Sequence, residues 1–174
     1  MTSRYKVARK AEFLDKVQKR AYELEGTKEG CSQCTLLPVL EAFGLENEMV
    51  FKAASGLAGG IADMRSACGA LTGGVMALSL KYGRERADME RPDEIAQEKL
   101  ESGIGPMGKY YKWFEREFGS VICSEVRKKL QGVDLSFSVP WQKELAEELG
   151  ITERCNEVVG KAARRVAELM LDKE

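Results

Sequence analysis

Histidine is absent from this chain of 174 residues. Its absence excludes imidazole-ligated metal sites, bis-histidine haem and every catalytic arrangement that pairs serine or cysteine with histidine. Five cysteines are present, and cysteine is the remaining residue type that is both a soft-metal ligand and a strong nucleophile. We therefore look for the chemistry of this protein among its thiols.

A charge excess and a long apolar run are also missing. Lys plus Arg (27) nearly equals Asp plus Glu (28), and without a basic excess we expect no nucleic-acid partner. The longest uncharged run, residues 66–80, has 15 residues, fewer than the about 20 that span a membrane. The first ten residues lack the apolar stretch that a secretory signal requires, so we expect no such signal. We expect no membrane insertion and a cytoplasmic location, where an odd number of cysteines does not form a disulfide framework.

Strand-like alternation is scarce, with one short segment at residues 133–139, and helical spacing of apolar residues is common. This pattern predicts an all-α fold. We expect a single domain over residues 1–174, a compact bundle of about seven helices with a glycine-rich loop before the central helix. The expected helices cover residues 8–24, 31–43, 46–55, 66–82, 93–118 with an interruption at 103–106, 121–130, 141–149 and 153–171.

Four of the five cysteines fall near expected helix N-termini. The pairs of expected cap and cysteine are Thr27 with Cys31, Ser66 with Cys68, Ser120 with Cys123, and Thr152 with Cys155. Free N–H groups and the helix dipole stabilise a thiolate there and lower its pKa. The alternative is that each cysteine is a small apolar core residue, which is the commoner role of one free cysteine.

Glycines surround one of these cysteines. Gly69, Gly73 and Gly74 follow Cys68 closely, although a glycine inside a helix costs about 1 kcal/mol relative to alanine. They predict a close approach to the backbone by a cluster, a ligand or another helix. Upstream, Gly59 and Gly60 can form a nest of N–H groups for an anion, or a plain turn. The loop lacks the ending of a phosphate-binding P-loop and follows a helix, so we expect no nucleotide there.

Cys31 and Cys34 form a CxxC pair. Residues three apart on a helix share a face, which suits a redox pair or two ligands of one metal. No βαβ pattern accompanies the pair, which argues against a thioredoxin, and no second CxxC is present to make a zinc ribbon.

Four segments together resemble the C_GCAxxG_C_C family of redox-active proteins. They are Cys31-Ser-Gln, residues 53–60 (AASGLAGG), residues 68–73 (CGALTG) and residues 114–120 (FEREFGS) before Cys123. The similarity spans residues 27–159, after an N-terminal helix in residues 1–25. It implies a helical, cysteine-dependent redox protein, often associated with transport systems, and related domains fused to cytochrome-type modules imply an iron–sulfur centre. The family's four cysteines map to Cys31, Cys68, Cys123 and Cys155, while Cys34 departs from its pattern.

Our leading hypothesis is an iron–sulfur cluster for electron transfer or redox sensing. Cys31, Cys68, Cys123 and Cys155 are the expected ligands, with Cys34 as an additional candidate, and Gly59, Gly60, Gly69 and Gly73 are expected to make room for the cofactor. Without metal, Cys68 is the expected attacking thiol, with Cys31 or Cys34 as its partner.

Two further readings remain open: a zinc or soft-metal binding module associated with transport, and a structural helical protein with buried thiols. The sequence indicates no substrate and leaves the electron-transfer or transport partner unknown. Its glycine-rich helical surfaces are compatible with a homodimer.

Overall fold

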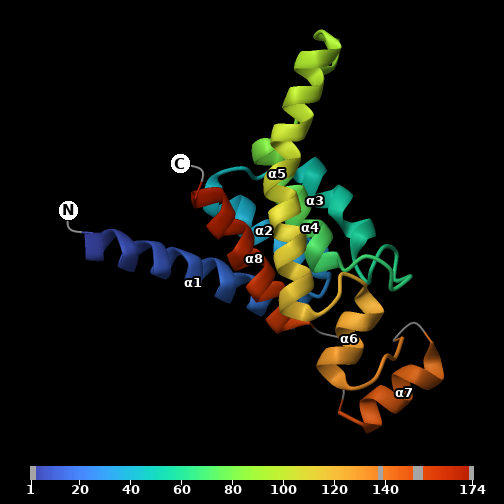
Figure 1. Cartoon of the computed structure of the whole chain (residues 1–174). Helices are drawn as coiled ribbons and strands as arrows, with labels where there is room; N and C mark the ends of the chain where they lie inside the picture. The colour runs from blue at the N-terminus through green and yellow to red at the C-terminus, as the bar shows by residue number, and fades with distance from the viewer. Residues whose placement is uncertain (1–2, 137–138, 151–154, 173–174) are drawn as a thin grey trace.

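The computed structural model describes residues 3–136, 139–150 and 155–172, and over these residues the chain is helical (Figure 1). Its α-helices are α1 (Ser3–Lys28), α2 (Cys31–Phe43), α3 (Glu48–Ala54), α4 (Gly69–Tyr82), α5 (Asp93–Phe118), α6 (Cys123–Gln131), α7 (Pro140–Glu148) and α8 (Asn156–Leu171). Two short 3₁₀ helices, η1 (Ser55–Leu57) and η2 (Arg86–Glu90), lie in connections. The predicted all-α class is confirmed, and a bundle describes the packing of the main helices.

The longest helix differs most from its prediction. We expected an interruption at residues 103–106, yet α5 runs through Pro106 without a break. The buried residues of α5 recur every three or four positions: Gly103, Pro106, Tyr110, Phe114 and Phe118. This face packs on α4, and the packing offsets the one backbone hydrogen bond that a proline removes.

Two further expectations need correction, and the all-α prediction holds at the one strand-like segment. Thr27 is no helix cap but lies inside α1, where its hydroxyl donates to the Glu23 carbonyl at 2.9 Å. The central helix begins at Gly69, after Ser66 and Ala67 have paired with another segment. Residues 133–136 and 139 form no strand, and residues 137 and 138 lie outside the described part of the chain.

Helix direction explains why the cysteines meet. Helices α2, α4 and α8 contact one another, and their N-termini lie toward one end of the molecule, the lower end in Figure 1. Helix α1 runs the opposite way beside α8, since Lys10 contacts Asp172 and the Tyr22 carbonyl accepts from Asn156. Helix α5 runs opposite to α4. The chain therefore starts a new helix at this end each time it returns there.

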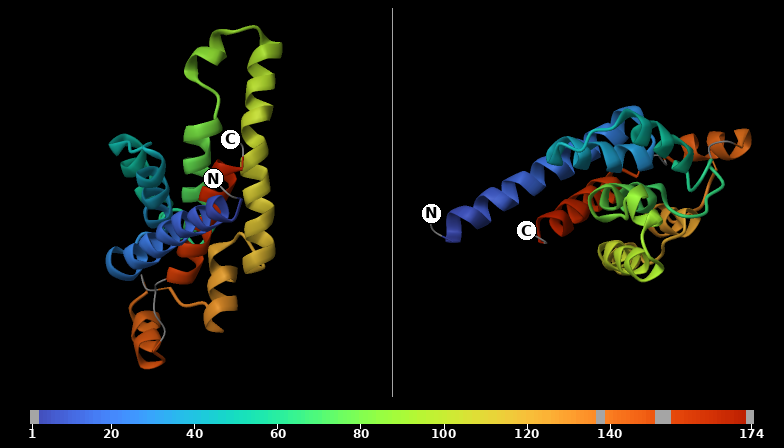
Figure 2. Two further views of the ribbon diagram at one scale, coloured as in Figure 1. Left: turned by 90° about the vertical axis from the view of Figure 1, so that its left-hand side faces the viewer. Right: turned by 90° about the horizontal axis from the view of Figure 1, so that it is seen from above.

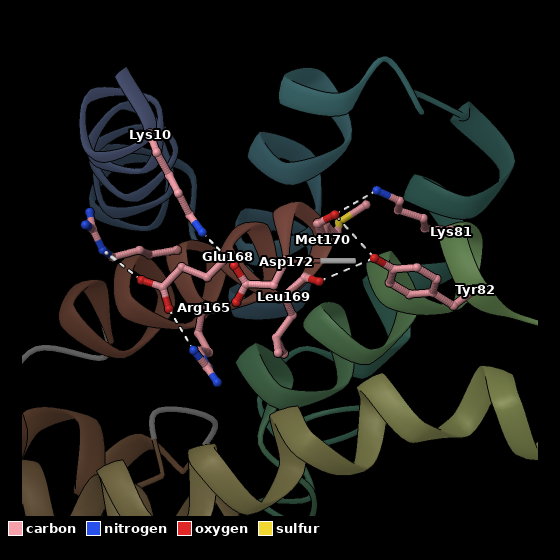
Figure 3. Close-up of polar contacts among 9 residues, drawn as sticks. Lys10, Lys81, Tyr82, Arg165, Glu168, Leu169, Met170 and Asp172 are labelled. Atoms are coloured by element: carbon pink, nitrogen blue, oxygen red, sulfur yellow. Dashed lines mark hydrogen bonds and ion pairs between the residues drawn. The ribbon is translucent and has the colours of Figure 1, made fainter. Parts of the chain in front are cut away.

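The opposite end is fixed by polar contacts between α4 and α8 (Figure 3). The Lys81 ammonium donates to the Met170 carbonyl at 2.8 Å, and the Tyr82 hydroxyl contacts the carbonyls of Leu169 and Met170 at 3.3 Å. Carbonyls at a helix C-terminus lack partners within the helix, and a cation there interacts favourably with the helix dipole. These contacts hold α4 and α8 in register, and thereby hold their N-termini together.

The aromatic residues of α5 form core, as their spacing predicts. Tyr110 and Phe114 are fully buried, and Phe118 is nearly so. The Tyr110 hydroxyl donates to the Ala70 carbonyl at 2.9 Å, which joins α5 to the first turn of α4. In Figure 2, η2 and the N-terminal part of α5 project beyond the other helices. Within the described residues, the length and apolar character that a membrane-crossing helix needs are not found in any helix.

Candidate cysteine centre

Each of four cysteines stands where a helix begins. Cys31 is the first residue of α2 and Cys123 the first of α6, while Cys68 directly precedes α4 and Cys155 directly precedes α8. The prediction that these cysteines lie at helix N-termini is confirmed.

The caps that we assigned are not those that form. Gly30, Cys68, Ile122 and Cys155 occupy the cap positions of α2, α4, α6 and α8. Ser66 lies before α4, and Ser120 instead accepts a hydrogen bond from the N–H of Ile122 at 3.0 Å. Thr152 is outside the described residues.

A short antiparallel bridge places Cys68 beside Cys123, which is 55 positions later in the chain. Ala67 pairs with Ile122. The Cys68 N–H donates to the Val121 carbonyl at 2.8 Å, and the Cys123 N–H donates to the Ser66 carbonyl at 2.6 Å. Because the bridge ends where both helices begin, α4 and α6 present their cysteines from adjacent backbone positions.

The glycine-rich loop makes a left-handed turn next to this bridge. Residues 59–63 all have positive φ, between 50° and 78°, a conformation that costs L-residues roughly 1–2 kcal/mol each. Loop hydrogen bonds hold the turn, from the Arg65 N–H to the Gly59 carbonyl (3.0 Å) and from the Ser66 N–H to the Gly60 carbonyl (2.9 Å). The Arg65 side chain also forms an ion pair with Asp134. The turn brings the N–H of Gly59 to the thiol of Cys31, to which it donates a hydrogen bond.

These elements enclose a cavity of about 330 Å³ at the cysteine end. Three thiol residues line it: Cys31, Cys123 and Cys155. Charged side chains line it as well, namely Glu25, Glu29, Asp63 and Arg127. Cys68 is 5% exposed and lies close enough to the other three for their charges to act on its thiol. The structure thus gathers four cysteines from the starts of four helices, three of them lining the cavity and Cys68 buried next to them.

The four predicted glycines occupy different surroundings. A Cβ on Gly69 would collide with the Cys31 sulfur, and one on Gly60, whose φ is +78°, would lie 2.7 Å from the Cys123 Cβ. Gly59 lines the cavity. Gly73 lies against the Ser32 backbone of α2, which is the helix-packing alternative. Glycine is therefore required at 60 and 69 by the cysteines themselves.

The expected lowering of thiol pKa is wrong for the cysteines that show a shift. Burial, and after it the charge of Glu25, raises the pKa of Cys31 to about 11. Burial, and after it the charge of Cys31, raises the pKa of Cys155 to about 12. Burial, and after it the charge of Cys31, also raises the pKa of Cys68 well above its ordinary value. N–H groups of Gly59 and Ser32 act in the opposite direction on Cys31, but burial is the larger effect.

Comparison with protein families gives one match. Residues 30–169 match the family described as "Putative redox-active protein (C_GCAxxG_C_C)". The chain belongs to this family. All five cysteines lie inside the matched region, and a redox-active protein is what the resemblance of the four segments implied. Searches of curated proteins and of solved structures gave no match.

The fifth cysteine of this family member is set apart from the cavity. Cys34 lies one turn further along α2, is 4% exposed and donates its S–H to the Glu29 carbonyl at 3.3 Å. It also contacts the buried carboxylate of Glu25, and burial is the main cause that raises its pKa. Cys34 therefore lies behind Cys31 and does not line the cavity.

Sequence reasoning missed Glu25 and Arg127, although both carry a signal. Glu25 continues the buried stripe of Leu14, Val17 and Ala21 on α1, and it is 4% exposed. A carboxylate at a core position indicates a special environment, since charged residues are seldom fully buried. Arg127 is also 4% exposed and lies four residues after Cys123, on the same helix face. Glu25 accepts a long hydrogen bond from the N–H of Cys155 (3.5 Å), and Arg127 lowers the pKa of that thiol.

Proposed function

We propose that this protein binds an iron–sulfur cluster through Cys31, Cys68, Cys123 and Cys155 and uses it for electron transfer or redox sensing. The observation that carries the proposal is the convergence of these cysteines, each at the start of a different helix: three line one cavity of about 330 Å³, and Cys68 lies next to those three.

The donor set fits such a cluster. Four thiolates satisfy both common cluster types. The pKa values of Cys31 and Cys155 are raised to about 11 and about 12, so these thiols are protonated at neutral pH until a metal displaces the proton. The backbone N–H groups of Gly59 and Ala70 lower the pKa of the Cys31 and Cys68 thiols, respectively, against the larger effect of burial. Hydrogen bonds to cluster sulfur are one of the means by which a protein tunes the potential.

A single metal ion is the other occupant that four cysteines could hold. Among the described residues, no group of three or more Cys, Asp or Glu side chains has the arrangement of a site for one ion. Zinc remains the alternative, and metal analysis distinguishes it from a cluster.

The surrounding residues would set the properties of the site. A bound cluster supplies one-electron chemistry. Arg127 places a buried positive charge beside Cys155, while Glu25 accepts from the Cys155 backbone and adds a negative charge to the cavity lining. The left-handed turn at residues 59–63 forms part of the cavity wall beside the partly exposed Cys31. Arg127 would offset part of the charge of an anionic centre, whereas the carboxylate of Glu25 would oppose it.

The test is purification without oxygen, followed by a visible spectrum with iron, sulfide and zinc assays on the same sample. We expect broad absorption that bleaches on reduction, with iron and sulfide in equal amounts. Replacing any one of the four cysteines by serine should remove most of the iron and the colour. Cys34→Ser is the matched control and should keep both, because Cys34 shares helix α2 with Cys31 but directs its S–H to the Glu29 carbonyl. A colourless, iron-free protein that also fails to take up iron and sulfide would overturn the proposal.

A further inference from the structure

The thiol of Cys34 has no role in the proposed cluster, yet it lies next to one of the ligands. Cys31 and Cys34 belong to the first turn of α2 and are three positions apart. Cys34 is almost completely buried, whereas Cys31 is partly exposed and lines the cavity. One thiol of the pair is thus open to a reagent that enters the cavity, and the other is shielded behind it.

The start of α2 can bring the two sulfurs into a bond. Residues three apart on a helix have Cβ atoms about 5–6 Å apart, and a disulfide needs about 3.5–4.5 Å, so an adjustment of roughly 1–2 Å closes the gap. Cys31 is the residue that can move, because as the first residue of the helix its N–H is not required for an intrahelical hydrogen bond. Gly30 precedes it with φ of +100°, and the Gly30 carbonyl accepts from the Cys34 N–H at 2.9 Å, so the backbone already joins the two ends of the pair.

The other three candidate thiols stand at the starts of other helices: Cys68 at α4, Cys123 at α6 and Cys155 at α8. The bridge between residues 66–68 and 121–123 fixes Cys68 and Cys123. A bond from Cys31 to any of the three would join two helices, whereas a bond to Cys34 stays within one helical turn. The pair within α2 is therefore the one that the fold favours.

We propose that Cys31 and Cys34 form a reversible disulfide that withdraws Cys31 from the four-cysteine set and so couples cluster binding to thiol oxidants. The disulfide itself does not depend on the proposed cluster, but its consequence for the ligand set rests on that function. The oxidant is a small disulfide. The Cys31 sulfur attacks it and releases one thiol, and the Cys34 sulfur then attacks Cys31 in the mixed disulfide and releases the second. Two protein thiols are oxidised, one small disulfide is reduced, and the two protons end on the released thiols.

The experiment exposes reduced, metal-free protein to oxidised glutathione, blocks the remaining thiols and maps the products by mass spectrometry. We expect an internal bond between Cys31 and Cys34 with loss of two hydrogens per chain. Cys34→Ser keeps a donor for the Glu29 carbonyl and is the matched variant. It should form no such bond and should accumulate glutathione on Cys31. A bond from Cys31 to Cys68, Cys123 or Cys155, five free thiols after treatment, or the loss of two hydrogens per chain in Cys34→Ser as well would each overturn the proposal.

A second readout separates this inference from the proposed function. Oxidised and re-reduced samples are incubated with iron and sulfide, and bound iron is measured. Loss of a ligand should reduce iron uptake roughly tenfold or more in the oxidised sample, and reduction should restore it. Equal uptake by both samples would overturn the coupling. If even the reduced protein takes up no iron while the Cys31–Cys34 bond forms, the cluster and the coupling fail and the disulfide alone stands.

Discussion

Lys81 at the end of α4 donates a hydrogen bond to the carbonyl of Met170 at the end of α8, at 2.8 Å. The same two helices begin beside Cys68 and Cys155. A contact at one end of a parallel helix pair therefore fixes the separation of two cysteines at the other end.

Lys81→Met should lower the free energy of unfolding by about 1–2 kcal/mol, because it removes a charged donor from carbonyls at a helix C-terminus. Urea unfolding of the metal-free protein measures the change. Lys16→Met is the control: Lys16 pairs only with Glu12 on an exposed surface, and such pairs contribute about 0–1 kcal/mol. Equal losses in the two variants would contradict a special role for the Lys81 contact.

Gly69→Ala should destabilise the protein by about 1–3 kcal/mol, since the new Cβ collides with the Cys31 sulfur and lies 3.0 Å from the Leu57 carbonyl. It should also reduce iron content after reconstitution, because it displaces a proposed ligand. Gly108→Ala is the matched helical control. No atom lies within 4 Å of its new Cβ, and it should stabilise by about 0.5–1 kcal/mol. A stabilised Gly69→Ala variant would show that the space beside Cys31 is not constrained.

Periodicity in the sequence was enough to predict the helices but not how they begin. The predicted segment 31–43 is α2 to the residue, ended by Gly44 with φ of +63°. The starts of α4 and α6 were misplaced because Ser66 and Ala67 pair with residues 121–123. That pairing joins segments far apart in the sequence, and no local sequence pattern predicts it.

The residues of the candidate site could be named from the sequence, but their convergence in space could not be predicted. The spacing of cysteines indicated four helix N-termini, but their convergence depends on α2, α4 and α8 being parallel, which is a property of packing. The sequence also could not indicate the left-handed turn. Ile61, Ala62 and Asp63 adopt positive φ against their own preference, held there by the hydrogen bonds of the loop.

The reduced, metal-free protein should lose stability as pH rises from about 9 toward 11. The pKa of Cys31 is raised by burial from an ordinary value of 9.0 to about 11, so the folded state holds this proton more tightly than the unfolded state. The protonated Cys31 thiol makes its full contribution to the free energy of unfolding below pH 9. As pH approaches 11 this contribution is lost, and the free energy of unfolding falls by roughly 1–3 kcal/mol. Urea unfolding at a series of pH values measures it, and the loss should be smaller in Cys31→Ser. An identical pH profile for both proteins would contradict the raised pKa.

Removing the buried charge of Arg127 should lower the reduction potential of the reconstituted protein. Arg127 lines the cavity and already lowers the pKa of Cys155, that is, it stabilises negative charge on that sulfur. Reduction adds negative charge to a cluster, so a nearby cation favours the reduced state. Arg127→Gln should shift the potential downward by roughly tens of millivolts, measured by titration of the visible absorption, whereas Arg127→Lys keeps the charge and should retain most of the potential. If both variants shift equally, the guanidinium acts through its shape and hydrogen bonds, and the electrostatic account of the site is wrong.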